Sequence, residues 1–338
     1  MRERPILRTG VAVTELGFGA ASIGNLYRET SDADAEEAVD VAWALGIRYF
    51  DTAPHYGLGL SERRLGRALR KYPRDEYVLS TKVGRLLVPN EHRTGQDSDG
   101  FVVPDDTVRQ WDFSRDGVRR SLDGSLARLG LDRVDILYAH DPDQADPDAG
   151  VRVAPFLAEL RDEGAVSSVG VGTNSALEAA RLLARTDIDL AMLAGRYTLL
   201  EQNSLDDALR VAATTGKSVV AVGAFNSGLL ATENLAADAR YDYKPAEAPL
   251  IARAVALAEV CARFGVTVPQ AAIAFPLTHP SVVNVTLGMR SAAQVQRNVE
   301  LYQASIPADL WDELKAEGLL RSDAPTEAAG SVHPDSQG

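Results

Sequence analysis

Eight short runs of apolar, often β-branched residues recur along this chain of 338 residues, and longer segments rich in Ala, Leu, Arg and Glu lie between them. The runs occupy residues 16–22, 47–53, 77–84, 134–140, 166–173, 189–195, 218–225 and 281–288. Several are apolar without alternation, which is typical of parallel strands covered on both faces. Eight strands, each followed by a helix over roughly 300 residues, predict an α/β fold of the (β/α)8 TIM-barrel type.

The helix candidates carry ordinary start and stop signals. Residues 31–46 open with a Ser/Asp cap, have acids in the first turn and end at a glycine. The other candidates occupy residues 61–73, 114–130, 153–164, 175–186, 204–216 and 250–265. An open doubly wound sheet is the alternative fold, because GFGAASIG (17–24) loosely resembles its glycine turn, although no acidic residue is clearly placed about 20 positions later.

Three segments lie outside the repeat. Residues 5–14 predict a β-hairpin around Thr9 and Gly10 that caps the bottom of the barrel. Residues 85–113 predict a long polar loop after the third strand, and loops of that length are usually functional or mobile. Residues 321–338 have the composition of a disordered tail, which leaves residues 1–320 as a single catalytic barrel domain.

The composition excludes several classes of function. A formal net charge of -13 and a pI of about 4.9 argue against a nucleic-acid partner. The single cysteine, Cys261, excludes an internal disulfide and a multi-cysteine zinc site, and no metal site is predicted. The N-terminus lacks the apolar core of a signal peptide, and no run approaches the ~18–20 apolar residues of a membrane span. We therefore expect a soluble, cytoplasmic protein that does not bind a membrane.

Four chemically active side chains follow the ends of three neighbouring strands. Asp51 ends the second strand with Tyr56 in the loop beyond it, Lys82 ends the third, and His140 ends the fourth. Active sites of such barrels lie at the carboxyl ends of the strands. A lysine cation near a phenol lowers the phenol's pKa, a carboxylate balances the buried lysine, and an imidazole can orient a substrate oxygen. Together they predict a tyrosine that exchanges a proton with a carbonyl or alcohol oxygen.

Each of these residues also has an ordinary structural interpretation. Alone, Asp51 is more often a helix cap, His140 a structural histidine, Lys82 a surface charge and Tyr56 a loop aromatic. His55 is interpreted as a wall or turn residue near the substrate, and Glu62 as support for the start of the following helix. Trp111 and Phe113, at the end of the long loop, are either core residues or a substrate wall.

At these motifs the sequence resembles the aldo-keto reductase superfamily. The stretches that carry the resemblance are FDTAPHYGLGLSERRLGRAL, STKVG, DILYAHDPD, GVGTNS and GMRSAAQVQRN, and it runs from about residue 6 to about residue 315. It implies an oxidoreductase that uses NAD or NADP, with Asp51, Tyr56, Lys82 and His140 as its catalytic tetrad.

The resemblance also places the cofactor. It assigns Thr173 and Asn174 to the nicotinamide amide, and it assigns the adenosine-phosphate end to Gly288, Arg290, Ser291, Gln294 and Asn298. A glycine turn that opens a helix agrees with phosphate binding there.

Three positions depart from the family pattern. The region Ala194, Gly195 and Arg196 stands where many members have a glutamine after the sixth strand. Val222 stands where many members have a tyrosine that stacks on the nicotinamide after the seventh strand, and Phe225 lies nearby as a candidate substitute. The basic residues that clamp a 2′-phosphate are absent, although Arg290 and Arg297 remain nearby, so NAD and NADP are both expected.

Finer motifs, which are HDPD after the fourth strand, the end of the long loop with the following helix (WDFSRDGVRRSLDGSLARLGLDRVDIL) and GRYTLLEQ, resemble the aldose 1-dehydrogenase branch. That branch includes L-fucose and D-threo-aldose dehydrogenases and lies close to pyridoxal 4-dehydrogenase. The resemblance implies oxidation of a sugar hemiacetal to a lactone by a monomer or homodimer, with a small sugar or aldehyde as substrate. The alternatives are a pyridoxal 4-dehydrogenase, a reductase of aldehydes and ketones, and, in a different class, a cofactor-binding regulatory subunit such as the potassium-channel β subunits.

Overall fold

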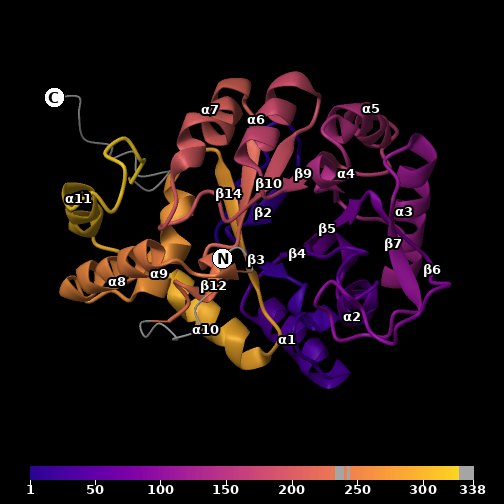
Figure 1. Ribbon diagram of the computed structural model, residues 1–338, viewed down its shortest axis with the longest axis horizontal. Helices are drawn as coiled ribbons and strands as arrows, with labels where there is room; N and C mark the ends of the chain where they lie inside the picture. Colours follow the sequence, from indigo (N-terminus) through magenta and orange to yellow (C-terminus); the bar gives the residue numbers. More distant parts are fainter. Residues whose placement is uncertain (233–239, 242–243, 327–338) are drawn as a thin grey trace.

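A closed barrel of eight parallel strands forms the centre of the protein (Figure 1). The computed structural model describes residues 1–232, 240–241 and 244–326. The barrel strands are β3 (Leu16–Gly19), β4 (Tyr49–Asp51), β5 (Val78–Val83), β8 (Ile136–His140), β9 (Ser168–Thr173), β10 (Leu190–Ala194), β11 (Ser218–Val222) and β14 (Val282–Gly288). Each lies within one of the eight predicted runs. The (β/α)8 prediction is therefore confirmed, and the open sheet is excluded.

Helices surround the strands (Figure 1). In the described part of the chain they are α1 (Asp32–Ala44), α2 (Leu60–Leu69), α3 (Arg115–Leu129), α4 (Pro142–Ala145), α5 (Ala149–Asp162), α6 (Ala176–Arg185), α7 (Ala208–Thr215), α8 (Ala248–Arg263), α9 (Val268–Ala274), α10 (Ala292–Gln303) and α11 (Ala308–Ala316). Ser31, Ser114 and Ser175 accept a hydrogen bond from a backbone N–H of the first turn, so these serines begin α1, α3 and α6. Cys261 is buried in α8, as expected.

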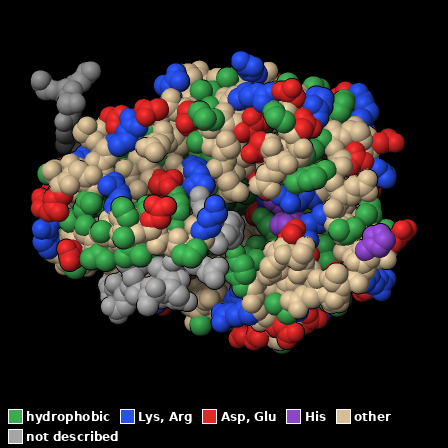
Figure 2. Space-filling model, in the orientation of Figure 1, with side chains coloured by type: hydrophobic (Ala, Val, Ile, Leu, Met, Phe, Trp, Pro, Cys, Tyr) green, Lys and Arg blue, Asp and Glu red, His purple; other side chains and the backbone are tan. Residues whose placement is uncertain are grey.

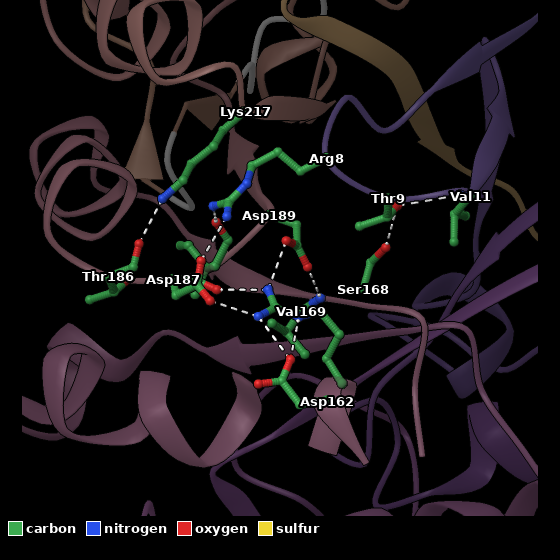
Figure 3. Close-up of polar contacts among 12 residues, drawn as sticks. Arg8, Thr9, Val11, Asp162, Ser168, Val169, Thr186, Asp187, Asp189 and Lys217 are labelled. Atoms are coloured by element: carbon green, nitrogen blue, oxygen red, sulfur yellow. Dashed lines mark hydrogen bonds and ion pairs between the residues drawn. The ribbon is translucent and has the colours of Figure 1, made fainter. Parts of the chain in front are cut away.

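The N-terminal hairpin closes the bottom of the barrel. Strands β1 (Glu3–Pro5) and β2 (Ala12–Thr14) pair in antiparallel register, which confirms the predicted cap. Its turn lies against the start of the barrel strands, where Ser168 donates to Thr9 at 2.9 Å and the backbone N–H of Leu7 donates to Ser218 at 3.0 Å. Figure 3 shows this region, in which Arg8 forms an ion pair with Asp187.

The segment after β5 is an insertion, as predicted, but it is not irregular throughout. Strands β6 (Arg85–Pro89) and β7 (Thr107–Trp111) form an antiparallel pair. Between them Phe101 forms an isolated antiparallel bridge with Leu26, in the loop after β3. The insertion is therefore fixed at both of its ends and near its middle, and it adds a wall to one side of the barrel mouth. Another short pair, β12 (Arg240–Tyr241) and β13 (Lys244–Pro245), precedes α8.

The C-terminal residues beyond the predicted domain boundary remain in contact with the barrel as far as residue 326. Ala324 is buried, and the Pro325 carbonyl accepts a hydrogen bond from Thr278 at 2.7 Å. Residues 321–326 thus belong to the packed structure, whereas residues 327–338 of the predicted tail lie outside the described residues. None of the described helices is long and apolar enough to cross a membrane.

Candidate active site

Asp51 and Lys82 form a buried ion pair at the carboxyl ends of β4 and β5. The Lys82 ammonium donates to Asp51 Oδ2 at 2.6 Å and to the Thr52 carbonyl at 3.0 Å. Both side chains are almost fully enclosed. Burial opposes the charge on Lys82, but the charge of Asp51 and the phenol of Tyr56 outweigh it, so the pKa of Lys82 is raised. The lysine is therefore a fixed cation.

Tyr56 lies directly beside this cation. The ammonium nitrogen of Lys82 is 4.7 Å from the centroid of the Tyr56 ring. The low-polarity surroundings raise the pKa of the phenol, and the Lys82 charge lowers it by less, so the net pKa of Tyr56 is raised. The predicted contact is present, but the expected net lowering of the pKa is wrong for the protein alone, because burial of the phenol outweighs the lysine.

His140 completes the group at the end of β8. Its ring lies edge-on to the Tyr56 ring, with centroids 5.9 Å apart. Burial, followed by the charge of Lys82, holds its pKa well below the usual range, so the imidazole is neutral. Nε2 lies 3.7 Å from Asp141, and the buried Nδ1 has no partner in the described part of the chain. A neutral imidazole with an unused nitrogen can hydrogen-bond an uncharged substrate oxygen.

His55 and Phe101 form an aromatic wall beside the tetrad. The His55 ring lies 5.4 Å from both the Phe101 and the His140 rings, edge-on in each case. Burial, aided by the charge of Arg109, lowers the pKa of His55 to about 2. The His55 ring is therefore neutral and packs against both aromatic neighbours. Sequence reasoning missed Phe101, although it is the only Phe, Tyr or Trp between positions 90 and 106.

A charged pair and an indole lie next to His140. Arg85 donates to Asp141 at 2.9 Å, and its guanidinium carbon is 4.2 Å from the Trp111 ring centroid. Trp111 is 38% exposed, and its ring also stacks on Phe113, with centroids 5.8 Å apart. Phe113 is partly buried and packs against the main core and against Gly84, where an added Cβ would lie 2.0 Å from its ring. The structure thus brings Trp111, through Arg85, toward the site, with Phe113 stacked between Trp111 and the core.

Glu62 lies in the first turn of the helix after Ser61, as interpreted from the sequence, and it also has a second set of contacts. The helix α2 begins at Leu60, with Gly59 as its N-cap. The buried Glu62 carboxylate accepts from Thr81 at 2.9 Å and from Arg128 at 2.5 Å. Glu62 therefore links α2 to β5 and α3, and it holds the strand that carries Lys82.

The residues predicted to hold the nicotinamide follow β9. The Thr173 hydroxyl donates to Asp143 at 3.0 Å and accepts from the Ser175 backbone, so it already has partners. Asn174 is exposed, and its carbonyl accepts from Arg196 at 2.8 Å. Of the predicted pair, Asn174 is the one whose side chain is available to a ligand.

The loop after β11 carries a buried amide that the sequence did not reveal. Phe225 is half-buried and packs against the main core. The next residue, Asn226, is buried with a φ of 45°, and it donates to the Gly195 carbonyl at 3.4 Å. Its Oδ1 has no hydrogen-bond partner among the described residues. A buried amide oxygen without a donor fits a site that takes a polar ligand group.

The segment after β14 was predicted to hold the adenosine phosphate. Ser291 caps α10, and Gln294 accepts from the Arg290 backbone at 3.0 Å. The Arg290 guanidinium donates to the carbonyls of Leu26 and Arg28, so it fixes the loop after β3. The predicted residues differ in exposure: Gly288 is exposed, Arg290, Ser291 and Gln294 are partly buried, and Asn298 is buried. A glycine before a capped helix, together with the orphaned Asn226 oxygen, fits a dinucleotide.

A hollow in the surface shown in Figure 2 contains histidine beside basic and hydrophobic side chains. The closed barrel, with Asp51, Tyr56, Lys82 and His140 grouped at the ends of its strands, is the architecture of one class of protein. The chain belongs to the aldo/keto reductase family, whose model matches residues 15–317. Enzymes of this family use nicotinamide cofactors.

Individual relatives are similar over nearly the whole chain. It is 47% identical to a D-threo-aldose 1-dehydrogenase from Pseudomonas sp over 92% of this chain and 96% of the relative. It is 39% identical to a pyridoxal 4-dehydrogenase from Microbacterium luteolum, over 94% and 98%. Among solved structures, the holo form of the aldo-keto reductase AKR11C1 from Bacillus halodurans matches with a TM-score of 0.76 and 26% identity, over 95% of this chain and 97% of that one.

Proposed function

We propose that this protein is an aldose 1-dehydrogenase that uses NAD or NADP to oxidise the C1 hemiacetal of a sugar to a lactone. The contact of Tyr56 with the buried Lys82–Asp51 pair, opposite a neutral His140, is the observation that carries the proposal. The likeness to a D-threo-aldose 1-dehydrogenase supports the choice of substrate class.

In this reaction Tyr56 is the general base. The C1 hydroxyl of the sugar gives its proton to the phenolate oxygen of Tyr56 as the C1–O bond becomes a carbonyl. The bound nicotinamide supplies the acceptor for the hydride that leaves C1. Lys82 stabilises the phenolate, and Asp51 keeps Lys82 charged and in place. His140, held neutral, hydrogen-bonds the reacting oxygen and sets its orientation without competing for the proton.

Asn174 and Asn226 are the residues that would hold the nicotinamide end. Asn174 is exposed at the end of β9, and Asn226 offers a buried oxygen after β11. Ser291, Gln294 and the backbone around Gly288 would hold the phosphate end, where α10 begins. Arg290 and Arg297 donate to backbone carbonyls, so a 2′-phosphate would have to compete for them.

The substrate side of the site suits a polyhydroxylated molecule. The Arg85–Asp141 pair offers both a donor and an acceptor beside His140. Paired donors and acceptors suit vicinal hydroxyls. His55 and Phe101 close the opposite wall.

A spectrophotometric screen for reduced nicotinamide tests the proposal. The protein is mixed with NAD or NADP and L-fucose, D-arabinose, L-galactose, D-glucose or pyridoxal. Reduction with one stereochemical series of sugars is the expected result. Reaction with pyridoxal alone would support a pyridoxal 4-dehydrogenase, which the relative at 39% identity favours as the second candidate. No reduction with any compound, although the cofactor binds, would overturn the dehydrogenase proposal and direct the search to aldehyde reduction and then to a regulatory role.

A further inference from the structure

A line of three hydroxyl groups runs through the barrel interior to the hidden side of Asp51. The hydroxyl of Ser80 lies 2.7 Å from Asp51 Oδ1. The Tyr49 hydroxyl lies 3.0 Å from Ser80, and the Tyr138 hydroxyl lies 3.2 Å from Tyr49. Asp51 thus contacts Lys82 through one oxygen and this line of hydroxyls through the other.

The hydrogen bonds of the line have a single consistent direction. A hydroxyl has only one proton, and Ser80 donates it to the carboxylate of Asp51, which can only accept. The Phe50 carbonyl, at 3.5 Å, is a much longer alternative for that proton. Tyr49 must therefore donate to Ser80, and Tyr138 must donate to Tyr49. Every proton in the line points toward Asp51.

Both tyrosines are held as proton donors. Their side chains are fully buried, and burial raises the pKa of each phenol far above its ordinary value, as does the negative charge of Asp51. In a medium of low polarity, hydrogen bonds in series polarise and strengthen one another. The last of them acts on the carboxylate that holds Lys82.

The line does not lead to water. Below Tyr138 the barrel interior is filled by an apolar cluster that includes residues of the N-terminal hairpin, among them Ile6 and Val13, together with Leu190 and Met192. A proton taken up at Tyr56 therefore has no exit along these hydroxyls. These hydroxyls can therefore act only by stabilising charge and by fixing the position of the group that they contact.

The strands next to the tyrosines leave room for their rings, since Gly17 lies on β3 beside β4 and Gly170 on β9 pairs with Tyr138. A Cβ at Gly17 would lie 2.8 Å from the Tyr49 ring, and a Cβ at Gly170 would lie 3.0 Å from the Tyr138 ring. Real Cβ atoms are rarely found so close to a neighbouring carbon. The two glycines thus allow two large polar side chains to lie in the barrel interior, which is usually filled with branched apolar residues.

We propose that Ser80, Tyr49 and Tyr138 are positioning residues, which stabilise the Asp51 carboxylate from behind and thereby fix the Lys82 ammonium beside Tyr56. The inference deepens the proposed function and rests on it for its catalytic consequence. It assigns no contact with substrate or cofactor to these three residues.

The primary test observes Lys82 directly, without substrate or cofactor. The chain has five lysines, so protein labelled with ¹⁵N-lysine gives few side-chain signals, and Lys82→Met assigns the one of interest. The variants are Ser80→Ala, Tyr49→Phe and Tyr138→Phe. The two tyrosine variants each remove one oxygen and preserve the ring, so they keep the test valid if Ser80→Ala does not fold.

Tyr77→Phe is the matched control, because Tyr77 is also buried and its hydroxyl has no partner among the described residues. The expected result is faster exchange of the Lys82 ammonium protons with water in Ser80→Ala and Tyr49→Phe, a smaller effect in Tyr138→Phe, and none in Tyr77→Phe. Unchanged shift and exchange of the Lys82 signal in both Ser80→Ala and Tyr49→Phe would overturn the inference, as would an equal change in Tyr77→Phe.

Kinetics then separate this inference from the proposed function. With a sugar that is turned over, kcat should fall roughly 10-fold in Ser80→Ala, the factor expected when one hydrogen bond to a charged group is lost, while KM stays unchanged. The pH at which oxidation becomes efficient should also rise, because a displaced Lys82 lowers the pKa of Tyr56 less. A protein that turns over no sugar but shows the changed Lys82 signal would refute the dehydrogenase and leave the positioning role supported.

Discussion

Replacing Lys82 with methionine should destabilise the protein strongly, and replacing its partner at the same time should restore much of the loss. The two charges are 2.6 Å apart and almost fully enclosed. At an effective dielectric constant of ~20, their attraction is about 6 kcal/mol. The removal of each ion from water costs several kcal/mol, so the pair as a whole contributes little net stability. Without Lys82, however, Asp51 remains as a buried charge with no cation.

The expected values follow from the difference between removing one charge of the buried pair and removing both. Lys82→Met should lower the free energy of unfolding by about 3–5 kcal/mol, the usual cost of removing one partner of a buried pair. Adding Asp51→Asn, which removes the charge and keeps the shape, should return more than half of that loss. A double-mutant cycle measured by urea unfolding gives the coupling between the two residues.

Lys71→Met is the matched control for the substitution itself. Lys71 forms ion pairs with Glu36 and Asp40 at 3.0 and 2.7 Å, but all three side chains are more than one-third exposed. Exposed pairs contribute only about 0–1 kcal/mol, so this variant should be nearly as stable as the parent. Equal losses in Lys82→Met and Lys71→Met, or simple additivity of Lys82→Met and Asp51→Asn, would refute the reasoning that the buried charge of Asp51 is the dominant cost.

Three further outcomes are expected. Tyr56→Phe should abolish sugar oxidation and leave cofactor affinity, measured by fluorescence titration, within about threefold, because it removes only the proton acceptor; near-normal turnover would contradict the mechanism. Burial lowers the pKa of His279 to about 4, so between pH 6.5 and 4 only the unfolded state takes up the proton. Up to about 3 kcal/mol of stability should therefore be lost as the pH falls through this range. In unfolding curves measured at several pH values, His279→Gln should reduce this dependence of stability on pH. Gly84→Ala should cost more than about 2 kcal/mol, because the backbone φ of 107° strains any other residue and the added Cβ would also meet Phe113 at 2.0 Å. Gly216→Ala, at a φ of 64° with open space around it, should cost about 1–2 kcal/mol, and equal losses in thermal unfolding would contradict an added cost at Gly84.

The barrel could be predicted because its strands are defined locally. Runs such as 16–22 and 218–225 are almost entirely apolar or small, and glycines and capped helices separate the runs. The pair β6–β7 could not be predicted in this way. Seventeen residues separate Pro89 from Thr107, so no short turn indicates the hairpin, and β7 is mostly polar. Pairing of this kind depends on tertiary contacts that the local pattern does not show.

The candidate site also has features that the sequence predicts and features that depend on tertiary structure. The approach of Asp51, Lys82 and Tyr56 follows from the rule that parallel strands present their carboxyl ends at one edge. Two features were not accessible in this way. Asn226 reads as an ordinary turn residue in the sequence, and only the fold shows that its side chain is buried. The net direction of the Tyr56 pKa depends on how far burial exceeds the effect of Lys82, and no pattern in the sequence reports burial of a loop residue.

The raised pKa of Tyr56 bears on the direction in which the site works. In the protein alone the phenol is protonated at neutral pH, and this form can donate a proton to a carbonyl but cannot accept one from an alcohol. Oxidation therefore needs the ionised phenol, and the Lys82 cation is the group that makes this form accessible. Sugar oxidation should thus become more efficient as the pH rises. A fixed position of Lys82 matters most for sugar oxidation. A cation that moved away from the phenol would no longer oppose the effect of burial, which raises the pKa of Tyr56. This explains why Asp51, which contacts no substrate in the proposed mechanism, is held through both of its oxygens.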